Sequence, residues 1–365
     1  MRVLMTGGGT AGHVNPAIAI ANTIKEMEPD SIIEFVSSNL KNDKARELVP
    51  RYGYKLHGVD ICGRYQIWNP KNIKTAYYML KSNIQAKKII SDFAPDVIIG
   101  TGGFACYPLL NAGASMGIPT LLHESNAIAG RAVKKLSPKV DCVMVNFDAV
   151  IDALPGAKKT VRVGNPMIIK KQAGESVNLD EVRQVLCVGG SGGAEEFNNG
   201  VVATVAALAS EFPNTVFYHA SGKRDFDRMK GEYERLGLGD KKNAVLVDYI
   251  YDMDKQMQNS DVIISRAGAM TLSELAIMGK AAILVPSPNV IYNHQYKNAK
   301  PIADAGACLL VEEKEFASNK LTQAARELLS DKEKRAMFEK NIKAFAVEDA
   351  NKVIYDIVKE YAKKN

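Results

Sequence analysis

The fold is indicated by residues 1–20, which read MRVLMTGGGTAGHVNPAIAI. Arg2–Met5 is a short apolar stretch typical of a buried strand, and it runs directly into a glycine-rich loop. From Pro16 to Ile24 the apolar residues recur at helical spacing. A strand, a glycine loop and a helix in this order predict the first unit of a Rossmann-like α/β domain.

The same unit recurs about 180 residues later. Gln184–Val188 is a strand pattern, Gly189–Ala194 is a glycine loop, and Val201–Ala209 is a helix pattern. Because strands and helices alternate after each loop, we predict an α/β protein with two Rossmann-like domains, each built on a parallel sheet. The other expected strands are Ser31–Val36, Asp96–Ile99, Pro119–Leu122, Cys142–Val145, Val216–Ala220, Ala244–Val247, Val262–Ser265 and Ala281–Val285.

The chain of 365 residues is long enough for two domains. We expect an N-terminal domain at 1–165 and a C-terminal domain at 166–348, joined through the Gly-, Pro- and Lys-rich stretch Val163–Asn178. A C-terminal helix at about 349–365 can pack back on the first domain.

No apolar run approaches the roughly 18 residues that cross a bilayer, and the first strand reaches glycine too soon for a signal peptide. The five cysteines are widely spaced and odd in number, which argues against a disulfide framework or a zinc ribbon. We therefore expect a soluble, intracellular protein.

Positive charge is concentrated in the first half of the chain. Residues 1–165 hold 20 Lys and Arg against 13 Asp and Glu, whereas residues 166–365 hold 27 against 28. Residues 61–91 contain no acid at all. The asymmetry predicts an anionic partner for the first half, either a membrane surface or nucleic acid, and the glycine loops argue against nucleic acid because they suit a small anionic ligand.

The first loop carries a histidine where its helix begins. The loop lacks Gly-Lys-Ser/Thr, so it is not a Walker phosphate loop, and its G-x-G-x-x-G match at Gly7, Gly9 and Gly12 is weak evidence for a dinucleotide. Glycines let a ligand approach the backbone, and a helix start favours anionic groups. His13 at this position can act as a base near neutral pH, although a solvated or helix-capping histidine fits the spacing equally well.

Two further loops follow strands of the first half. The first is Gly100-Thr101-Gly102-Gly103-Phe104 and the second is His123-Glu124-Ser125-Asn126. The second is not the zinc motif H-E-x-x-H, because residue 127 is Ala. Open α/β sheets bind ligands at the carboxyl ends of their strands, so three such loops predict a cleft, whereas each alone fits an ordinary turn.

In the second half, Ser265–Glu274 follows a strand and opens a helix whose first N–H groups can bind a diphosphate. Glu274 is placed to accept hydrogen bonds from a ribose, although a capping-box partner fits the same spacing. Asn293-His294-Gln295 follows the next strand, within reach of sugar hydroxyls.

Asp252-Met253-Asp254 has the D-x-D spacing of some metal sites. It precedes a helical pattern, and acids in a first helical turn offset the helix dipole, so the helix-start interpretation is the better one. We predict no metal and no cofactor.

Together these motifs resemble the MurG family, the UDP-N-acetylglucosamine:lipid I N-acetylglucosaminyltransferases of peptidoglycan synthesis. The shared patterns, in order from Val3 to about Leu310, are G-G-T-x-G-H, G-G-F/Y, H-E-x-N, G-N-P, G-G-S-x-G-A and S-R-x-G-A-x-T-x-S-E followed by Q. The combination is highly specific, although no single piece is.

The resemblance implies a GT-B fold, with two Rossmann-like domains facing a cleft. The N-terminal domain would take the lipid acceptor and the C-terminal domain the UDP-sugar. The implied reaction is inverting transfer of GlcNAc from UDP-GlcNAc to the C4 hydroxyl of MurNAc in undecaprenyl-linked lipid I, which yields lipid II. The implied location is peripheral, on the cytoplasmic side of the cell membrane.

The resemblance also implies roles for single residues. His13 would be the catalytic base or an orienting group. Asn126 would hold the transferred GlcNAc, Ser191 the diphosphate and Ile250 the uracil. The implied UDP-GlcNAc-binding residues are Thr10, Ala11, Gly12, Asn126, Ser191, Ile250, Ala269, Met270, Thr271, Leu272, Ser273, Glu274 and Gln295. The acceptor-side candidates are Gly102, Gly103, Phe104, His123 and Glu124.

Because an undecaprenyl acceptor cannot leave the membrane, we expect the acid-free stretch 61–91 to dock on the anionic leaflet. An ordinary amphipathic surface helix is the alternative interpretation of that stretch.

The chain departs from the family pattern at two positions: Ile168 stands where Arg is usual, and Gly192 where Gln is frequent. Two other functions fit parts of the pattern. One is a glycosyltransferase that acts on diacylglycerol, and the other is a non-catalytic nucleotide-sugar-binding membrane protein.

Overall fold

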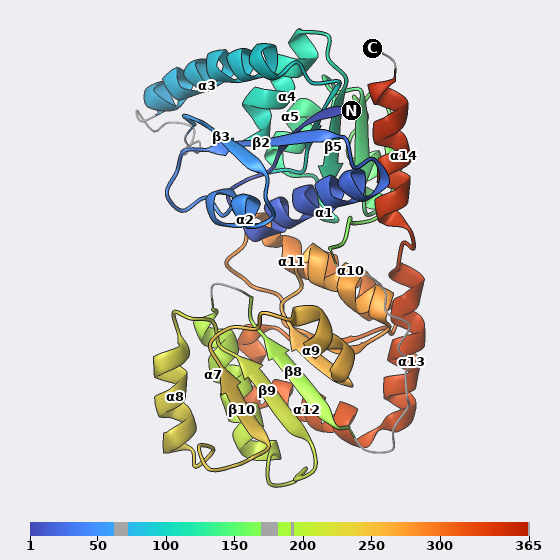
Figure 1. Ribbon diagram of the computed structural model, residues 1–365. Helices are drawn as coiled ribbons and strands as arrows, with labels where there is room; N and C mark the ends of the chain where they lie inside the picture. The colour runs from blue at the N-terminus through green and yellow to red at the C-terminus, as the bar shows by residue number, and fades with distance from the viewer. Residues whose placement is uncertain (62–71, 169–181, 191–192, 364–365) are drawn as a thin grey trace. The chain divides into compact units, whose positions relative to one another are not determined.

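The computed structural model describes residues 1–61, 72–168, 182–190 and 193–363, without the side chains of 72–76 and 291. The chain divides into two compact units (Figure 1). The first comprises Met1–Ile168 and Val347–Asn365, and the second comprises Ile169–Ala346. No helix in the described part of the chain is long and apolar enough to cross a membrane.

The first unit contains a seven-stranded sheet in the order β3-β2-β1-β4-β5-β6-β7, and every strand pair is parallel. Its strands are β1 (Arg2–Thr6), β2 (Ile32–Ser38), β3 (Lys55–Val59), β4 (Val97–Gly100), β5 (Thr120–Glu124), β6 (Cys142–Val145) and β7 (Thr160–Arg162). The strand order reverses between β1 and β4, and such a switch point is where open α/β sheets bind ligands.

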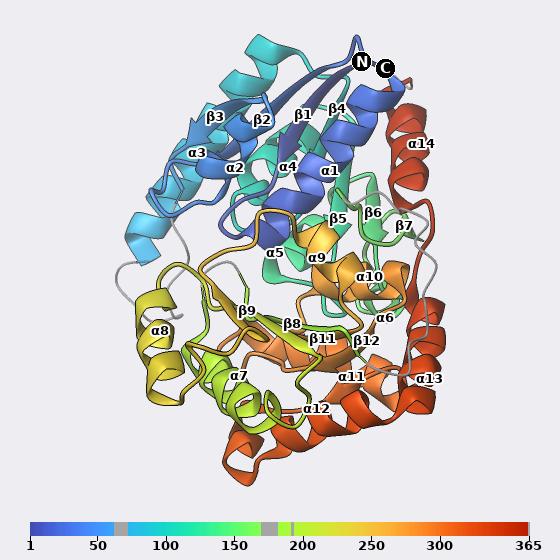
Figure 2. The ribbon, with the colours of Figure 1, turned by 60° about the horizontal axis from the view of Figure 1, so that its bottom comes forward.

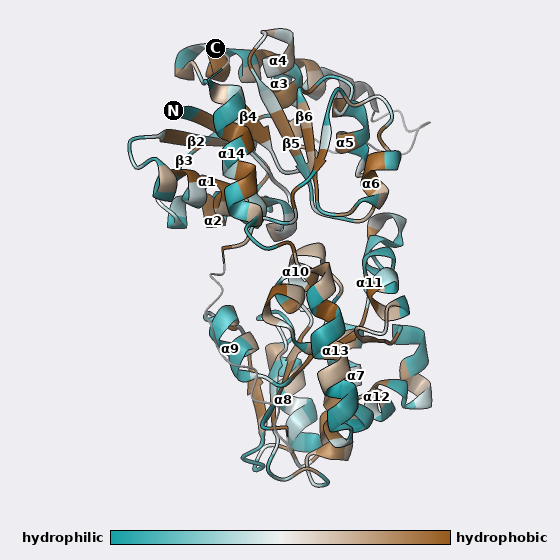
Figure 3. Cartoon of the chain, turned by 90° about the vertical axis from the view of Figure 1, so that its right-hand side faces the viewer, coloured by the Kyte–Doolittle hydropathy of each residue, from teal (hydrophilic) through white to brown (hydrophobic). Residues whose placement is uncertain are grey.

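Helices cover both faces of this sheet. They are α1 (Ala11–Met27), α2 (Ala45–Arg51), α3 (Asn72–Phe93), α4 (Cys106–Ser115), α5 (Arg131–Leu136), α6 (Ala149–Asp152) and α14 (Ala350–Ala362). Val3 and Met5 pack in the core with α1 and α14. Leu4 packs on the opposite face, with α3 and α4. The central strands are accordingly hydrophobic on both sides, as the brown β4 and β5 show (Figure 3).

The second unit has a six-stranded parallel sheet in the order β10-β9-β8-β11-β12-β13 (Figure 2). Its strands are β8 (Gln184–Val188), β9 (Val216–Ala220), β10 (Ala244–Val247), β11 (Val262–Ser265), β12 (Ala281–Leu284) and β13 (Leu309–Leu310). Its helices are α7 (Glu195–Leu208), α8 (Phe226–Arg235), α9 (Met253–Asn259), α10 (Ala269–Met278), α11 (His294–Asp304), α12 (Lys320–Ser330) and α13 (Lys332–Ile342), with 3₁₀ turns η1 (Ile291–Asn293), η2 (Glu313–Ser318) and η3 (Lys343–Phe345).

The two parallel sheets confirm the predicted pair of Rossmann-like domains. The sequence did not predict three strands, β3, β7 and β13. Each lies at or near a sheet edge, where burial is lower and the apolar signal is weaker; β13 has only two residues. The last helix, α14, packs on α1 through Ile354 and Val358. Most of the stretch Val163–Asn178 lies outside the described residues.

Candidate active site

His13 lies at the switch point of the first sheet. It is the third residue of α1, and Thr10 is the N-cap in an extended conformation. The His13 Nδ1 is 3.3 Å from the carbonyl oxygen of Thr101, which follows β4, and the Thr101 hydroxyl donates to the His13 carbonyl at 2.6 Å. The neighbouring loop therefore holds the imidazole. When Nδ1 donates to that carbonyl, Nε2 carries the basic lone pair of the neutral ring.

The loop after β4 fits closely around this histidine. A Cβ at Gly102 would lie 2.7 Å from His13 Nδ1, and a Cβ at Gly103 would lie 2.4 Å from the carbonyl oxygen of Gly8. Both glycines also have positive φ, 104° and 81°. Side chains are thus excluded at Gly102 and Gly103 because the loop touches the ring and the first glycine loop directly. Thr10 and Gly12 are exposed beside it.

His123 and Glu124 point into the first unit. His123 is 0% exposed, its Nε2 donates to the Gly164 carbonyl at 2.8 Å, and burial lowers its pKa to about 4. Glu124 is 4% exposed, and its carboxylate accepts from the Asn126 main chain at 3.0 Å, the Asn126 side chain at 3.1 Å and the Gly130 main chain at 2.8 Å. Glu124 therefore organises the loop that carries the half-buried Asn126, whereas His123 links β5 to the Gly164 main chain.

The glycine loop of the second unit follows β8. Ser191 and Gly192 lie outside the described residues, but Gly193 has a φ of 74°, and a Cβ there would lie 2.9 Å from the Ser221 carbonyl. Behind the loop, Asn198 donates to the same carbonyl at 2.9 Å and to Asp225 at 2.6 Å. Buried His219, whose pKa burial lowers to about 3, donates to Asn198 at 3.1 Å. This buried polar network fixes the loops after β8 and β9.

Arg266 links the loop after β11 to η2, to the residue that follows β12 and to α7. Its guanidinium pairs with Glu313 of η2, donates to the Val285 carbonyl at 3.2 Å, and lies 5.1 Å from the ring centre of Phe197. The side chain therefore braces the turn that leads into α10.

Helix α10 begins with Gly268 as its N-cap. Ala269 and Leu272 are buried in the core, so any ligand contact from them would come from the main chain, whereas Met270, Thr271 and Ser273 are half-buried. Glu274 is not a capping-box partner, because Gly268 has no side chain to complete the box and Glu274 is the sixth helical residue.

Glu274, in α10, has a strongly shifted pKa. Burial raises its pKa to about 7. Among the described residues, none donates a hydrogen bond to its carboxylate. A half-buried acid without a donor is a candidate binding group, because a ligand can supply the missing hydrogen bonds.

Two more predicted residues flank α10. Ile250 is buried in the core, between the partly exposed Tyr249 and the exposed Tyr251. Gln295, at the start of α11, accepts from the Ser287 main chain at 2.8 Å through its carbonyl oxygen. This bond orients the side chain, and the Gln295 amide nitrogen can donate a hydrogen bond to a ligand.

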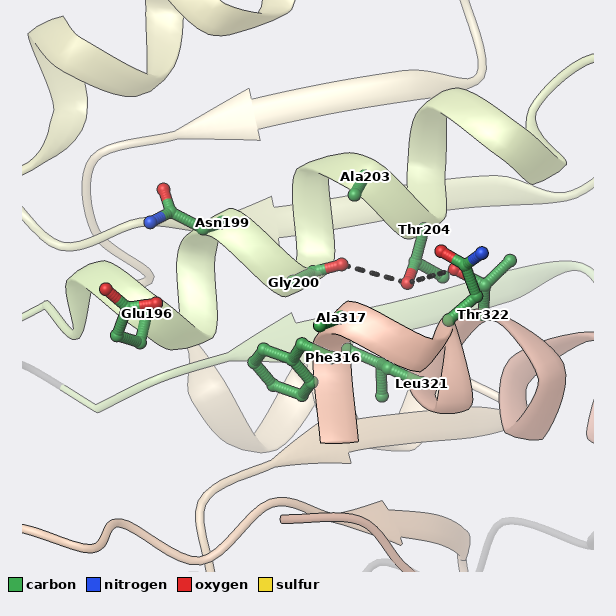
Figure 4. Close-up of a pocket in the computed structure, with 10 residues that line it drawn as sticks. Glu196, Asn199, Gly200, Ala203, Thr204, Phe316, Ala317, Leu321 and Thr322 are labelled. Carbon is green, nitrogen blue, oxygen red and sulfur yellow. Dashed lines mark hydrogen bonds between the residues drawn. The ribbon is translucent and has the colours of Figure 1, made fainter. Parts of the chain in front are cut away.

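Asp252 and Asp254 occupy the N-cap and the first turn of α9, as the helix-start interpretation predicts. Among the described residues, no group of three or more His, Cys, Asp and Glu is placed to hold a metal ion. A pocket of about 250 Å³ opens between α7, η2 and α12 (Figure 4). Its lining includes Asn199, Thr204 and Phe316 but none of the predicted site residues.

Sequence reasoning missed three residues that organise the site: Asp43, Asn198 and Glu313. Their partners are distant in sequence, so no local spacing pattern marks them. The only available signal was that Arg266, the partner of Glu313, belongs to a recognised motif.

Comparisons with known proteins match both units. Residues 3–145 match the glycosyltransferase family 28 N-terminal domain, and residues 184–354 match the family 28 C-terminal domain. The chain is therefore a family 28 glycosyltransferase with the GT-B fold. Fold alone is shared with a UDP-glucose:anthocyanidin 3-O-glucosyltransferase, at 14% identity and a TM-score of 0.69 over 100% of this chain and 99% of that one.

Full-length relatives narrow the assignment. The chain is 36% identical to the UDP-N-acetylglucosamine–N-acetylmuramyl-(pentapeptide) pyrophosphoryl-undecaprenol N-acetylglucosamine transferase of Lactococcus lactis, over 99% of both chains. It is 36% identical to the Exiguobacterium enzyme of the same name, again over 99% of both. The crystal structure of Acinetobacter baumannii MurG matches with a TM-score of 0.76 at 26% identity, over 98% of this chain and 99% of that one. The chain belongs to the MurG family.

Proposed function

We propose that this protein transfers GlcNAc from UDP-GlcNAc to the C4 hydroxyl of MurNAc in undecaprenyl-linked lipid I, forming lipid II for peptidoglycan synthesis. The observation that carries the proposal is the full-length identity to transferases named for this donor and this acceptor. In addition, the loop after β4 holds His13 in the first unit, and no described residue donates a hydrogen bond to the Glu274 carboxylate in the second.

His13 is the proposed base. Its Nε2 takes the proton from the C4 hydroxyl of MurNAc while that oxygen attacks C1 of GlcNAc from the face opposite the diphosphate. The bond from C1 to the diphosphate oxygen breaks, and UDP leaves with the electron pair. The anomeric carbon is inverted. The Thr101 carbonyl supports this role, because it accepts from Nδ1 and so favours the tautomer whose Nε2 is basic.

The second unit is the proposed donor site. The first turn of α10, with Gly268 as N-cap, supplies main-chain N–H groups that bind the diphosphate and stabilise the negative charge on departing UDP. Glu274 accepts hydrogen bonds from the ribose hydroxyls, and the amide nitrogen of Gln295 donates to hydroxyls of GlcNAc. In the first unit, Asn126 holds GlcNAc, and Thr10, Ala11 and Gly12 line the sugar.

The deciding experiment is incubation with radiolabelled UDP-GlcNAc and a short-chain lipid I analogue. We expect the label to appear in a disaccharide lipid with a β linkage. Transfer to diacylglycerol but not to the analogue would identify the protein as a different glycolipid transferase. UDP-GlcNAc binding without transfer to either acceptor would favour the non-catalytic alternative.

We also propose that the first unit docks on the anionic, cytoplasmic face of the cell membrane. Helix α3 supports this proposal, because Tyr77, Leu80 and Ile84 are 61%, 64% and 61% exposed at a spacing that puts them on one face. Lys87 is exposed on the same helix. An apolar face with basic residues fits an anionic leaflet.

In the structure, part of the positive charge of the stretch 61–91 is paired with acidic residues. Residues 62–71 of the acid-free stretch lie outside the described residues. Lys81 is ion-paired with Asp60 at 2.8 Å and Lys88 with Asp92 at 2.7 Å, so acids just outside the stretch offset part of its charge. The apolar face of α3 therefore carries more of the proposed attachment than its lysines do.

The docking test replaces Leu80 and Ile84 together by Glu. We expect the double variant to lose co-sedimentation with phosphatidylglycerol vesicles while it still uses a water-soluble acceptor. Met116→Glu is the matched control, because it places a new charge on an exposed apolar position of the same unit. Full vesicle binding by the double variant would place the docking surface elsewhere.

A further inference from the structure

Asp43 is a buried acid behind the first glycine loop. It lies between β2 and α2, and only 3% of its surface is exposed. A buried carboxylate is costly unless hydrogen bonds compensate it. Asp43 receives five of them: its Oδ1 accepts from the main chains of Gly9 at 2.9 Å and Ala45 at 3.0 Å, and its Oδ2 accepts from the Ser37 hydroxyl at 2.8 Å and from both the main chain and the hydroxyl of Ser38.

These bonds tie the glycine loop to the segment after β2. The Gly9 N–H donates to Asp43, and the Gly9 carbonyl accepts from the Lys44 main chain at 3.4 Å, so the two peptide groups that flank the Gly9 Cα are both held. Gly8 lies directly against the acid: a Cβ there would be 2.9 Å from Asp43 Oδ2 and 2.1 Å from Ser37 Oγ. The Gly7–Gly9 loop therefore packs directly against the hydrogen-bonded Asp43 carboxylate.

The other side of the same loop packs against Gly103, which in turn packs against the His13 ring. The Gly8 carbonyl oxygen would be 2.4 Å from a Cβ at Gly103, and that Cβ would be 3.3 Å from the His13 ring. A shift of the loop away from Asp43 would therefore move the backbone against which Gly103 and His13 pack. Displacements of about 1 Å near a reacting group can lower a rate roughly a hundredfold.

We propose that Asp43 is a positioning residue for the transfer reaction, whose carboxylate holds the Gly7–Gly9 loop in the geometry that His13 requires. The inference rests on the function proposed above. Asp43 touches neither substrate in this scheme. Its carboxylate accepts from the Gly9 N–H, a main-chain donor that a loop of this kind can otherwise offer to a bound anion.

The test is Asp43→Asn, which keeps the shape of the side chain but has one acceptor oxygen and places an NH₂ group against donors. With the lipid I analogue we expect kcat to fall at least tenfold, while the KM for UDP-GlcNAc stays within twofold. The Gly9 amide proton in an NMR spectrum should move upfield, because its charged acceptor is lost.

Asp141→Asn is the matched control. Asp141 belongs to the same unit and accepts from the Thr120 main chain at 2.9 Å and from Lys158 at 2.9 Å, at the opposite, amino-terminal end of β5. We expect it to lower Tm while kcat stays within twofold. If both variants lose kcat in proportion to Tm, or if Asp43→Asn keeps wild-type kcat, the positioning role is wrong. Failure of the wild-type protein to transfer GlcNAc would instead contradict the proposed function, and the Gly9 resonance would still report whether Asp43 holds the loop.

Discussion

Each unit of this protein places a carboxylate near the site end of its parallel sheet, and the two carboxylates have opposite environments. Asp43 in the first unit receives five hydrogen bonds from the protein; burial alone would raise its pKa, but the bonds from Ser38, Gly9, Ala45 and Ser37 outweigh burial and lower it. In the second unit, burial raises the pKa of Glu274 to about 7, and no described residue donates a hydrogen bond to its carboxylate.

The two carboxylates differ in how far the protein itself compensates their charge. A carboxylate that the protein satisfies organises its surroundings, whereas one left without donors reduces stability until a ligand supplies them. We infer that the first unit presents a preformed catalytic loop and that the second unit keeps binding capacity for the donor. Four predictions test that division.

The largest effect is expected at His13. His13→Ala removes the proposed base and should lower kcat by roughly 10²- to 10⁴-fold, while UDP affinity measured by calorimetry stays near the wild-type value. His13→Gln is a useful companion, because it keeps a polar group near the Thr101 carbonyl but has no basic nitrogen. Near-normal kcat in either variant would remove His13 from the chemical step.

Glu274→Ala, in the second unit, should weaken the binding of UDP. Loss of a charged hydrogen-bond acceptor costs about 1.5–3 kcal/mol, so UDP affinity should fall roughly ten- to hundredfold. Asp304→Ala is the control, since it removes a surface carboxylate of the same unit that pairs with Lys300. Equal UDP affinity in the Glu274 variant and the wild type would leave this carboxylate without a role in donor binding.

Stability should show the same asymmetry as a function of pH. The pKa of Glu274 is raised from 4.5 to about 7, so the folded state keeps a proton that the unfolded chain loses, and stability falls as the pH rises through that window. Glu274→Gln should therefore stabilise the protein at pH 8, by about 1–3 kcal/mol, and have little effect near pH 4. Thermal unfolding of both proteins at the two pH values measures this, and a Gln variant less stable than wild type at pH 8 would contradict it.

The sequence predicted the parts of the molecule that depend on local pattern. Apolar runs identified the central strands, and glycine loops with His13 and Ser265–Glu274 identified the ends of those strands. Edge strand β3 was missed because its residues alternate with polar ones and are only partly buried. A strand is recognisable in the sequence when most of its residues are buried and therefore apolar, and an edge strand gives a weaker signal.

Side-chain direction could not be predicted in the same way. Asp43 lies between lysines, a context typical of a solvated acid, and its burial depends on two loops that only the folded sheet brings together. Lys81 belongs to the acid-free stretch that is expected to dock on the membrane, but in the structure it pairs with Asp60, which follows β3. Glu124 was predicted on the acceptor side, and in the structure its carboxylate turns inward to its own loop.

Glu124 also provides the smallest predicted effect. Its carboxylate holds both the main chain and the side-chain amide of Asn126, so Glu124→Gln should loosen the residue proposed to hold GlcNAc. A neutral hydrogen bond contributes about 0.5–1.5 kcal/mol, and the KM for UDP-GlcNAc should rise roughly three- to tenfold. UDP affinity should not change, because UDP lacks the sugar that Asn126 is proposed to hold. This pairing of results separates the sugar contact of the first unit from the nucleotide contact of the second. A parallel loss of UDP affinity would show that Glu124 acts on the whole donor, and the proposed division of labour between the two units would then be wrong.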